Sequence, residues 1–254
     1  CDVGVGRSGG GNSPCPQLLT GLAEISDGAV ALGDDTRAGV TASKRGVAMV
    51  FQTYALYPHM TVAENMGFGL KMNGVPKTEI REKVKMASDI LKLDEYLKRK
   101  PANLSGVQRQ RVAIARALAC QPQLLVADEA VSALDVSVQA QIINLLQDLQ
   151  DDLGLAYLFI SHDMAVVERI SHRVAVMYLG RIVELGSRRQ VFENPQHAYT
   201  QKLLNAVPVA DPRLRRTDRT LNTDEIPSPV KPPGYEPPPV AMDEIEPGHF
   251  VATN

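Results

Sequence analysis

Two acidic residues that follow an apolar run are the clearest sign of chemistry in this sequence. Residues 124–127 are apolar, and Asp128 and Glu129 come directly after them. Such a run predicts a buried strand of a parallel sheet, with its acids at the carboxyl edge where ligands bind in open α/β sheets. One carboxylate can hold Mg²⁺, and its neighbour can act as general base on an attacking water. A strand ending in a solvated acidic turn would explain the same residues.

A glycine-rich segment near the start of the chain has the spacing of a phosphate-binding loop. Residues 6–13 read GRSGGGNS and match the pattern G-x-x-x-x-G-K-[ST], except that Asn12 replaces the lysine. Backbone N–H groups of such a loop curl round a phosphate, and the helix that follows adds partial positive charge. Ser13 is placed to bind Mg²⁺, whereas Asn12 offers only a neutral hydrogen bond. Pro14 and Pro16 remove two N–H donors but are sterically tolerable in a first helical turn.

A second helix start is predicted at Ser105. Ser105 and Gln108 have the spacing of a capping box, and the helix would bury Val107, Ile114 and Leu118. A plain helix cap is therefore one sufficient explanation of this segment.

Two polar residues directly follow predicted strands. Gln52 comes after the apolar run at 47–51, and His162 comes after the run at 156–160. In isolation each is a turn residue, and Asp135 is equally explained as a helix N-cap. The remaining histidines have no such context and are expected to be structural: His59, His172, His197 and His249.

Taken together and in order, these segments resemble the ABC-type ATPases. Asp128-Glu129 is similar to their Walker B motif, residues 104–108 (LSGVQ) to their signature, and His162 to their switch histidine. Val107 stands where the signature has a second glycine. If the backbone needs positive φ at that point, valine costs on the order of 1 kcal/mol.

The resemblance implies roles for particular residues, with ATP and Mg²⁺ as cofactors. It implies that Glu129, His162 and Gln52 are catalytic and that Ser13, Gln52 and Asp128 hold the metal. In this family the signature helix contacts ATP bound to the opposite subunit, and Asp135 lies at the dimer seam. The nucleotide-binding residues that the resemblance implies are Gly6, Ser8, Gly9, Gly10, Gly11, Asn12, Ser13, Ser105, Gly106, Gln108 and Asp135.

Two branches of importer ATPases are resembled by different parts of the chain. Residues 21–106, notably 49–66 (MVFQTYALYPHMTVAENM), look like the maltose/glycerol-phosphate type of sugar importer. From about Leu118 the likeness is to dipeptide/oligopeptide (glutathione) importers. The two halves meet at 109–119, a helix that both branches share. The segments that carry the second likeness are 128–135 (DEAVSALD), 194–200 (NPQHAYT) and 248–252 (GHFVA).

The hydrophobic periodicity of the segments around these residues predicts an α/β fold. Residues 1–52 alternate short strands with turns, residues 53–104 form an amphipathic helical lobe, and residues 105–204 alternate helix and strand as in a parallel sheet. Residues 205–254 are Pro-rich and too poor in apolar residues to build a core, so we expect them to be extended or disordered. This gives a P-loop NTPase domain of ABC type at 1–204, with a parallel-sheet core and inserted helical subdomain, and a C-terminal extension.

Composition and sequence patterns argue against several other classes of protein. The net charge of −2 gives no basic excess for nucleic acid, no apolar run approaches the ~20 residues that span a bilayer, and no signal peptide pattern opens the chain. Cys1, Cys15 and Cys120 are too few and too scattered for a disulfide framework or metal site, so a reducing cytosol is expected. The first residue is not Met and the phosphate loop follows almost at once, which predicts an N-terminally truncated chain.

We therefore expect the ATP-binding subunit of an importer, peripheral on the cytoplasmic face of the inner membrane. The resemblance implies as partners a second ATPase subunit (homo- or heterodimer), transmembrane permease subunits and a solute-binding protein, without nucleic acid. One alternative is a degenerate module that binds nucleotide without hydrolysing it, or only interacts, because Asn12 replaces the lysine. A soluble ATPase acting on DNA or the ribosome fits the importer-like segment around Gln52 less well. The solute itself is not identified.

Overall fold

A computed structural model describes residues 2–5, 14–23, 30–32, 35–36, 45–132, 134–206 and 240–253 of the chain. The phosphate-loop residues Gly6, Ser8, Gly9, Gly10, Gly11, Asn12 and Ser13 lie outside the described residues. Within the described ranges, no helix is long and apolar enough to span a bilayer.

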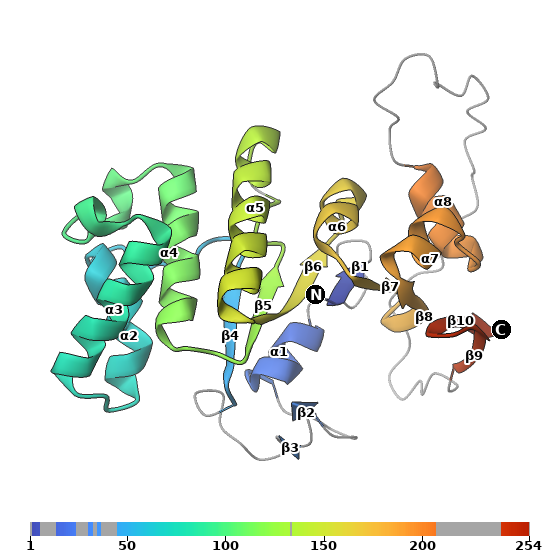
Figure 1. Cartoon of the computed structure of the whole chain (residues 1–254), viewed down its shortest axis with the longest axis horizontal. Helices are drawn as coiled ribbons and strands as arrows, with labels where there is room; N and C mark the ends of the chain where they lie inside the picture. Colours follow the sequence, from blue (N-terminus) through green and yellow to red (C-terminus); the bar gives the residue numbers. More distant parts are fainter. Residues whose placement is uncertain are drawn as a thin grey trace, which may run out of the picture.

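Eight of the described strands form one large sheet with helices packed around it (Figure 1). Its five strands β4, β5, β6, β1 and β7 are neighbours in this order and run parallel. β8, β10 and β9 continue the sheet on the β7 side with antiparallel pairing. In spatial order the strands are β4 (Val47–Phe51), β5 (Leu124–Asp128), β6 (Ala156–Ser161), β1 (Asp2–Val5), β7 (Arg173–Tyr178), β8 (Arg181–Ser187), β10 (His249–Thr253) and β9 (Ala241–Glu246).

The expectation of a parallel sheet throughout residues 105–204 is wrong for the strand after β7. Leu179 and Gly180 connect β7 to β8, and their φ angles are 49° and 80°. Two residues with positive φ form a tight hairpin turn, whereas a parallel crossover needs a dozen residues or more. β8 therefore returns antiparallel to β7. A separate small hairpin pairs β2 (Ala31–Leu32) with β3 (Asp35–Thr36).

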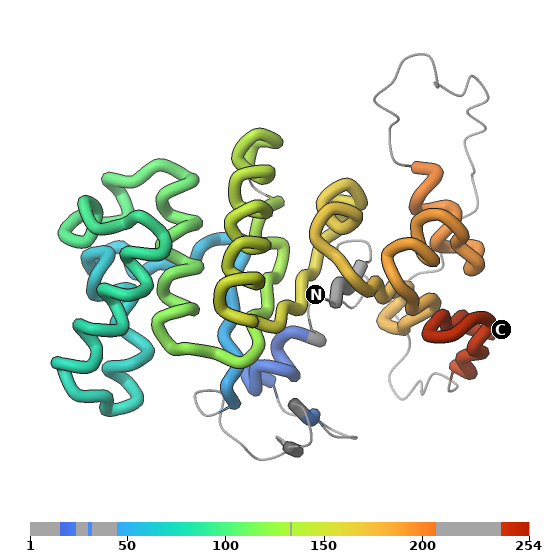
Figure 2. Tube along the Cα trace, in the orientation of Figure 1, coloured from blue at the N-terminus to red at the C-terminus, as the bar shows by residue number. Residues whose placement is uncertain are grey.

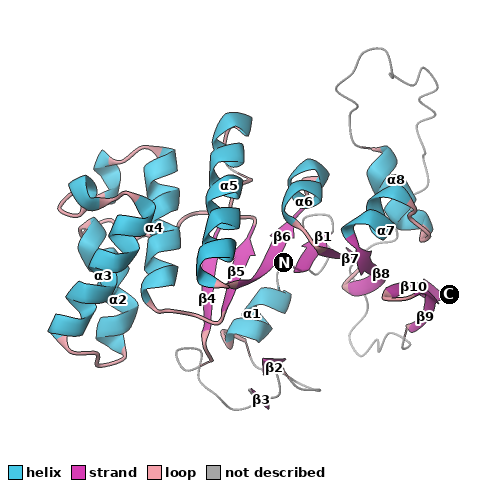
Figure 3. Ribbon diagram, in the orientation of Figure 1, coloured by secondary structure: helices cyan, strands magenta, loops and turns pink. Residues whose placement is uncertain are grey.

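The helical lobe predicted at 53–104 is present and lies at one end of the molecule (Figure 3). It contains α2 (Val62–Met72), α3 (Lys77–Leu91) and the short 3₁₀ turns Asp94–Tyr96 and Pro101–Asn103. α4 (Gly106–Ala119) contacts both lobe helices and also β4, so it joins the lobe to the sheet. The helices beyond it are α5 (Val136–Leu153), α6 (Met164–Ile170), α7 (Arg188–Glu193) and α8 (Ala198–Asn205), and α1 (Pro14–Thr20) lies near β4.

One hydrophobic cluster runs through the lobe and the sheet. Met66 and Leu91 in the lobe, Ile114 on α4 and Phe159 on β6 each expose less than 2% of their surface and belong to this cluster. The buried face of α4 therefore belongs to the same core as the lobe and the sheet. Figure 2 follows the chain from β4 through the lobe and back across the sheet to the C-terminal hairpin.

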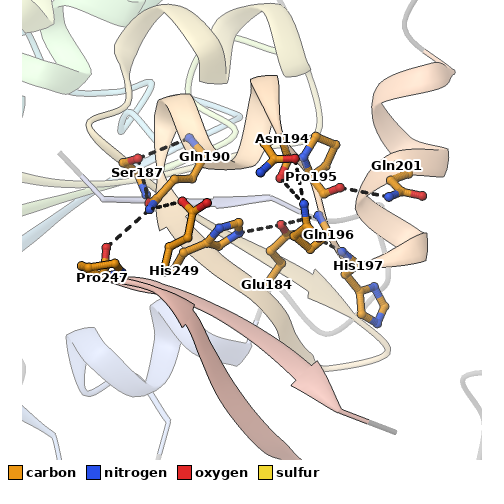
Figure 4. Close-up of polar contacts among 11 residues, drawn as sticks. Glu184, Ser187, Gln190, Asn194, Pro195, Gln196, His197, Gln201, Pro247 and His249 are labelled. Atoms are coloured by element: carbon orange, nitrogen blue, oxygen red, sulfur yellow. Dashed lines mark hydrogen bonds and ion pairs between the residues drawn. The ribbon is translucent and has the colours of Figure 1, made fainter.

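The C-terminal hairpin β9–β10 is part of the sheet. Phe250 pairs with Leu185 and Val251 with Glu184 across β10 and β8, and the His249 side chain is completely buried against β8 (Figure 4). The expectation that the whole C-terminal segment contributes nothing to a core is therefore wrong for residues 241–253. This hairpin is attached to the sheet by backbone hydrogen bonds and by the buried pair of His249 and Glu184. It therefore joins the sheet although few of its residues are apolar. The limits 1–204 and 205–254 remain a prediction.

Candidate functional site

Three of the polar residues singled out in the sequence meet at one edge of the sheet. β4, β5 and β6 are parallel neighbours, and Phe51, Asp128 and Ile160 are aligned across them. Gln52, Glu129 and the segment leading to His162 follow these positions directly. The apolar strands therefore bring their polar endings together at the carboxyl edge, which is where open α/β sheets bind ligands.

Glu129 and His162 form the central pair of the site. His162 Nδ1 lies 3.1 Å from Glu129 Oε1, and the two side chains are 49% and 20% exposed, respectively. Glu129 has a φ of 48°, and its backbone N–H donates to Ile160 O at 2.9 Å. The strand thus ends in a left-handed turn that aims the carboxylate at the histidine. With a proton on Nδ1, the imidazole orients the carboxylate and presents Nε2 to a ligand.

Asp128 lies beside this pair at the end of β5 and is half-buried. Burial, and then the neighbouring charge of Glu129, raise the pKa of the Asp128 carboxyl above its ordinary value. Two adjacent carboxylates in a partly desolvated position are stabilised by a divalent cation. Among the described residues, no group of three or more His, Cys, Asp or Glu side chains is arranged to enclose a metal ion. The donor set fits Mg²⁺, which keeps water and phosphate ligands and takes only one or two carboxylates from a protein.

Ser132 connects Gln52 to the Glu129 turn and was not identified from the sequence. Gln52 Nε2 donates to Ser132 Oγ at 3.0 Å, and Ser132 Oγ donates to Glu129 O at 2.9 Å. The donor atom of the Gln52 amide is thus used within the site, and its oxygen is the atom that a cation would need. No sequence pattern distinguishes a serine in a loop, so only the register of β4 against β5 reveals this contact.

The signature segment forms the first turn of α4, on the helical side of the site. Ser105 N donates to Gln108 Oε1 at 2.8 Å and Gln108 N to Ser105 Oγ at 3.3 Å, so the predicted capping box is present. Gly106 begins the helix. Val107 is not among the described non-glycine residues with positive φ, so the strain expected there is absent from the backbone. A cavity of about 350 Å³ opens beside this turn, between Val107 and Lys92.

Asp135 is the N-cap residue of α5 and is exposed. In the described part of that helix start its side chain makes no capping hydrogen bond, so the simple capping explanation does not account for it. Val136, the next residue, is 81% exposed. The Asp135 carboxylate and the Val136 side chain are thus both open to solvent at the start of α5.

The helix that follows the phosphate loop is held at its far end. α1 begins at Pro14 and includes Pro16, so this helix forms despite both prolines. Arg45 is buried and donates through Nη1 to Leu18 O at 2.7 Å and to Leu19 O at 3.1 Å. A cation at a helix C-terminus is electrostatically favourable. No sequence pattern had indicated this role for Arg45.

Three of the histidines that were expected to be structural make local contacts. His197 Nδ1 accepts from Tyr199 N at 3.1 Å and caps α8, and His249 is buried against Glu184. His59 stacks edge-on against Tyr57 at 6.1 Å between ring centroids.

Comparisons with known proteins show which families and relatives the chain resembles. The family described as ABC transporter matches residues 4–132, just over half of the chain. A second family, described as the oligopeptide/dipeptide transporter C-terminal region, matches residues 183–234. The chain is 49% identical to the glutathione import ATP-binding protein GsiA of Salmonella paratyphi A, over 98% of this chain and 41% of that protein, and 49% identical to GsiA of Escherichia coli K12 over the same shares. It therefore spans about two fifths of the length of these relatives.

Two solved structures share this fold. One is cbiO1 from Clostridium perfringens, part of the ABC transporter complex cbiONQ, with a TM-score of 0.68 and 27% identity over 76% of this chain and 79% of that one. The other is a dimeric ATP-binding cassette in a post-hydrolysis state bound to ADP and Pi, with a TM-score of 0.64 and 27% identity over 74% and 85% of the two chains.

Proposed function

The chain belongs to the ABC transporter family, and from that membership we propose that it is the ATP-binding subunit of an importer that couples ATP hydrolysis to solute uptake. The observation that carries the proposal is the 3.1 Å contact between Glu129 and His162 beside Asp128, at the carboxyl edge of the parallel strands. A general base next to a metal-binding carboxylate is what hydrolysis of a phosphoanhydride requires.

Each residue of the edge takes a part in the proposed reaction. Glu129 accepts a proton from the attacking water, and His162 holds the Glu129 carboxylate in place while its Nε2 faces the terminal phosphate. Asp128 and Gln52, with Ser13 of the phosphate loop, would hold Mg²⁺, which when bound neutralises phosphate charge. Ser132 fixes the Gln52 amide against the Glu129 turn.

The proposed substrate class is a dipeptide, an oligopeptide or glutathione. The match of residues 183–234 to the oligopeptide/dipeptide C-terminal region supports this class, as does the similarity to GsiA across nearly the whole chain. The likeness of residues 21–106 to sugar importers stays a prediction about the docking surface. We propose that the docking surface includes Tyr57, His59 and Phe68, whose rings pack together near the start of the lobe.

The proposed assembly is a dimer of ATPase subunits on the cytoplasmic face of a membrane, bound to permease subunits and served by a solute-binding protein. Asp135 and Val136 would lie at the seam between the subunits. ATP would then be enclosed by the phosphate loop of one subunit and by Ser105, Gly106 and Gln108 of the other. The proposal of this seam rests on the family resemblance, and the exposure of Asp135 and Val136 leaves both side chains accessible to a partner.

A second candidate function follows from Asn12 and Pro14. The loss of the lysine charge and of one N–H donor favours a degenerate module that binds nucleotide weakly or only interacts with partners. In that case the Glu129–His162 pair would be a remnant without turnover.

A pull-down against membranes that contain a peptide-type or a sugar-type permease pair tests the importer proposal. The chain should be retained by one pair, and Tyr57→Ser should weaken retention because Tyr57 is 37% exposed and packs on Phe68. Leu153→Ser, at an exposed apolar position on α5, is the matched control and should bind normally. Deletion of 207–239 alone keeps the β9–β10 hairpin and tests the rest of the C-terminal segment. Retention by neither pair would reject the importer assignment.

A further inference from the structure

Two consecutive residues after β4 have left-handed backbone conformations. The φ angle is 60° at Tyr54 and 46° at Ala55, and neither residue is glycine. Residues with a Cβ are strained in this region, and such strain persists only where surrounding contacts impose it. Two short-range hydrogen bonds, from Tyr54 N to Phe51 O at 3.2 Å and from Ala55 N to Thr53 O at 2.7 Å, close the turn. Further contacts must hold it in this form.

The holding contacts come from α4. Arg116 donates through Nη1 to Ala55 O at 2.5 Å and through Nη2 to Tyr54 O at 3.2 Å. The Cζ atom of Arg109 lies 5.8 Å from the centroid of the Tyr54 ring. One guanidinium thus binds the carbonyls of both strained residues. Its donors lie in one plane and can reach two acceptors at once, whereas the single ammonium group of a lysine is less suited to this geometry.

The same loop is fixed to the candidate site at its other end. Gln52 Nε2 donates to Ser132 Oγ, which donates to the carbonyl of Glu129. Residues 52–55 therefore connect the turn that carries Glu129 with α4, the helix that begins at the signature and joins the lobe to the sheet. The chain continues from this loop to α2 (Figure 1).

We propose that Arg116 is a positioning residue that holds residues 54–55 in a strained turn and so sets the position of Gln52. The proposal rests on the proposed ATPase function. While Arg116 binds both carbonyls, the turn keeps Gln52 against Ser132. Without Arg116 the two carbonyls lose these donors, the turn relaxes, and Gln52 leaves Ser132. Once Arg116 is removed, the strained turn keeps its two short-range hydrogen bonds and the Arg109–Tyr54 contact, but it loses both contacts to its carbonyls.

The turn itself can be tested without nucleotide, by hydrogen exchange of residues 52–56 in the unaltered chain. Arg116→Met should make these amides exchange about tenfold faster or more, because the turn opens locally. Arg116→Lys should give an intermediate rate. Arg169→Met is the control, since Arg169 on α6 binds Asn144 instead and should leave the rate unchanged.

Rescue by glycine separates positioning from simple packing. In the Arg116→Met background, Ala55→Gly should restore slow exchange, because glycine keeps the left-handed turn without a clamp. Lys92→Gly removes the same kind of strain elsewhere, since Lys92 has a φ of 54° at the end of α3, and it should restore nothing. Unchanged exchange in Arg116→Met, or equal effects of the two glycine substitutions, would overturn the proposal.

Kinetics then test the link to the site, in a chain whose phosphate loop carries Asn12→Lys and Pro14→Thr. Arg116→Met should lower kcat about tenfold with little change in KM, and Ala55→Gly should recover most of the loss. A change in KM alone would contradict the positioning role. If no variant hydrolyses ATP, the proposed function fails, while the exchange data still decide whether Arg116 holds the turn.

Discussion

His249 Nε2 lies 2.9 Å from Glu184 Oε1, and neither side chain has any exposed surface. The same carboxylate accepts from the backbone N–H of Gln196 at 2.9 Å and of His197 at 3.0 Å (Figure 4). Glu184 thus joins its own strand, β8, to two other segments: the loop between α7 and α8, and the C-terminal hairpin. Gly186 makes room for the ring, because a Cβ there would lie 3.0 Å from His249 Cδ2.

Removal of His249 should destabilise the whole sheet and not only the C-terminus. His249→Ala leaves Glu184 buried with two of its three partners, and breaking a buried pair costs about 3 kcal/mol. For a chain of this size we expect the midpoint of thermal unfolding to fall by about 6–12 °C. His59→Ala, at an exposed position, is the control. A shift of His249→Ala no larger than that of His59→Ala would show that the hairpin is not part of the cooperative unit.

Gly21→Ala should destabilise the helix that follows the phosphate loop. Gly21 has a φ of 76°, and a Cβ there would lie 2.6 Å from Arg45 Nε. Gly74 has a φ of 74° with nothing within 4 Å of a Cβ, so Gly74→Ala reports the strain alone. Backbone strain of this kind lowers the free energy of unfolding by about 1–2 kcal/mol, and the loss caused by Gly21→Ala should be larger. Denaturant unfolding measures the loss in each of the two variants. The difference between the two losses should disappear in the Arg45→Ala background, where the clash is removed. Equal losses in the two single variants would contradict the proposed contact.

Asp128→Asn should stabilise the chain without nucleotide while it weakens metal-dependent binding. Burial and the Glu129 charge raise the pKa of Asp128, so the folded state disfavours the charged form. Near neutral pH this penalty is present, and it falls away as the pH drops through the raised pKa. The variant should therefore unfold at a higher temperature near pH 7, with a smaller difference in acid. A lower unfolding temperature at pH 7 would show that the carboxylate is stabilised by contacts instead.

The sequence predicted the site edge because its signals are local. Apolar strands ending in Gln52, Asp128-Glu129 and Ser161-His162 can be read directly, and parallel neighbours must bring those endings together. Ser132 and Arg116 were missed because their partners are 80 and 61 or 62 positions away, and neither residue belongs to a periodic pattern.

The fold at the C-terminal side was predicted less well, for two physical reasons. The direction of β8 depends on the two-residue turn at Leu179 and Gly180, which a count of strand spacing would have identified as too short for a crossover. In the hairpin β9–β10, the outer strand β9 is acidic. The hairpin is held on the sheet by the pairing of β10 with β8 and by the Glu184–His249 contact. Composition carries no information about such a long-range polar pair.

Nucleotide binding by the unaltered chain should be weak. Asn12 lacks the lysine charge, worth about 1.5–3 kcal/mol, and Pro14 lacks a donor worth about 1 kcal/mol, so affinity should fall by about 10²-fold or more. Asn12→Lys with Pro14→Thr should recover most of it in calorimetry. Micromolar ATP binding by the unaltered chain would contradict this expectation.

Glu129 is the residue on which the proposed hydrolysis depends most directly, as the base that activates water. Phosphate release should be measured for the chain carrying Asn12→Lys and Pro14→Thr, with and without Glu129→Gln, alongside ATP binding by both. We predict that Glu129→Gln lowers turnover by about 10²-fold or more while ATP binding is retained, because the carboxylate beside His162 is lost and the amide keeps its shape. Turnover that is unchanged by Glu129→Gln would contradict the account and assign the hydrolysis to another base.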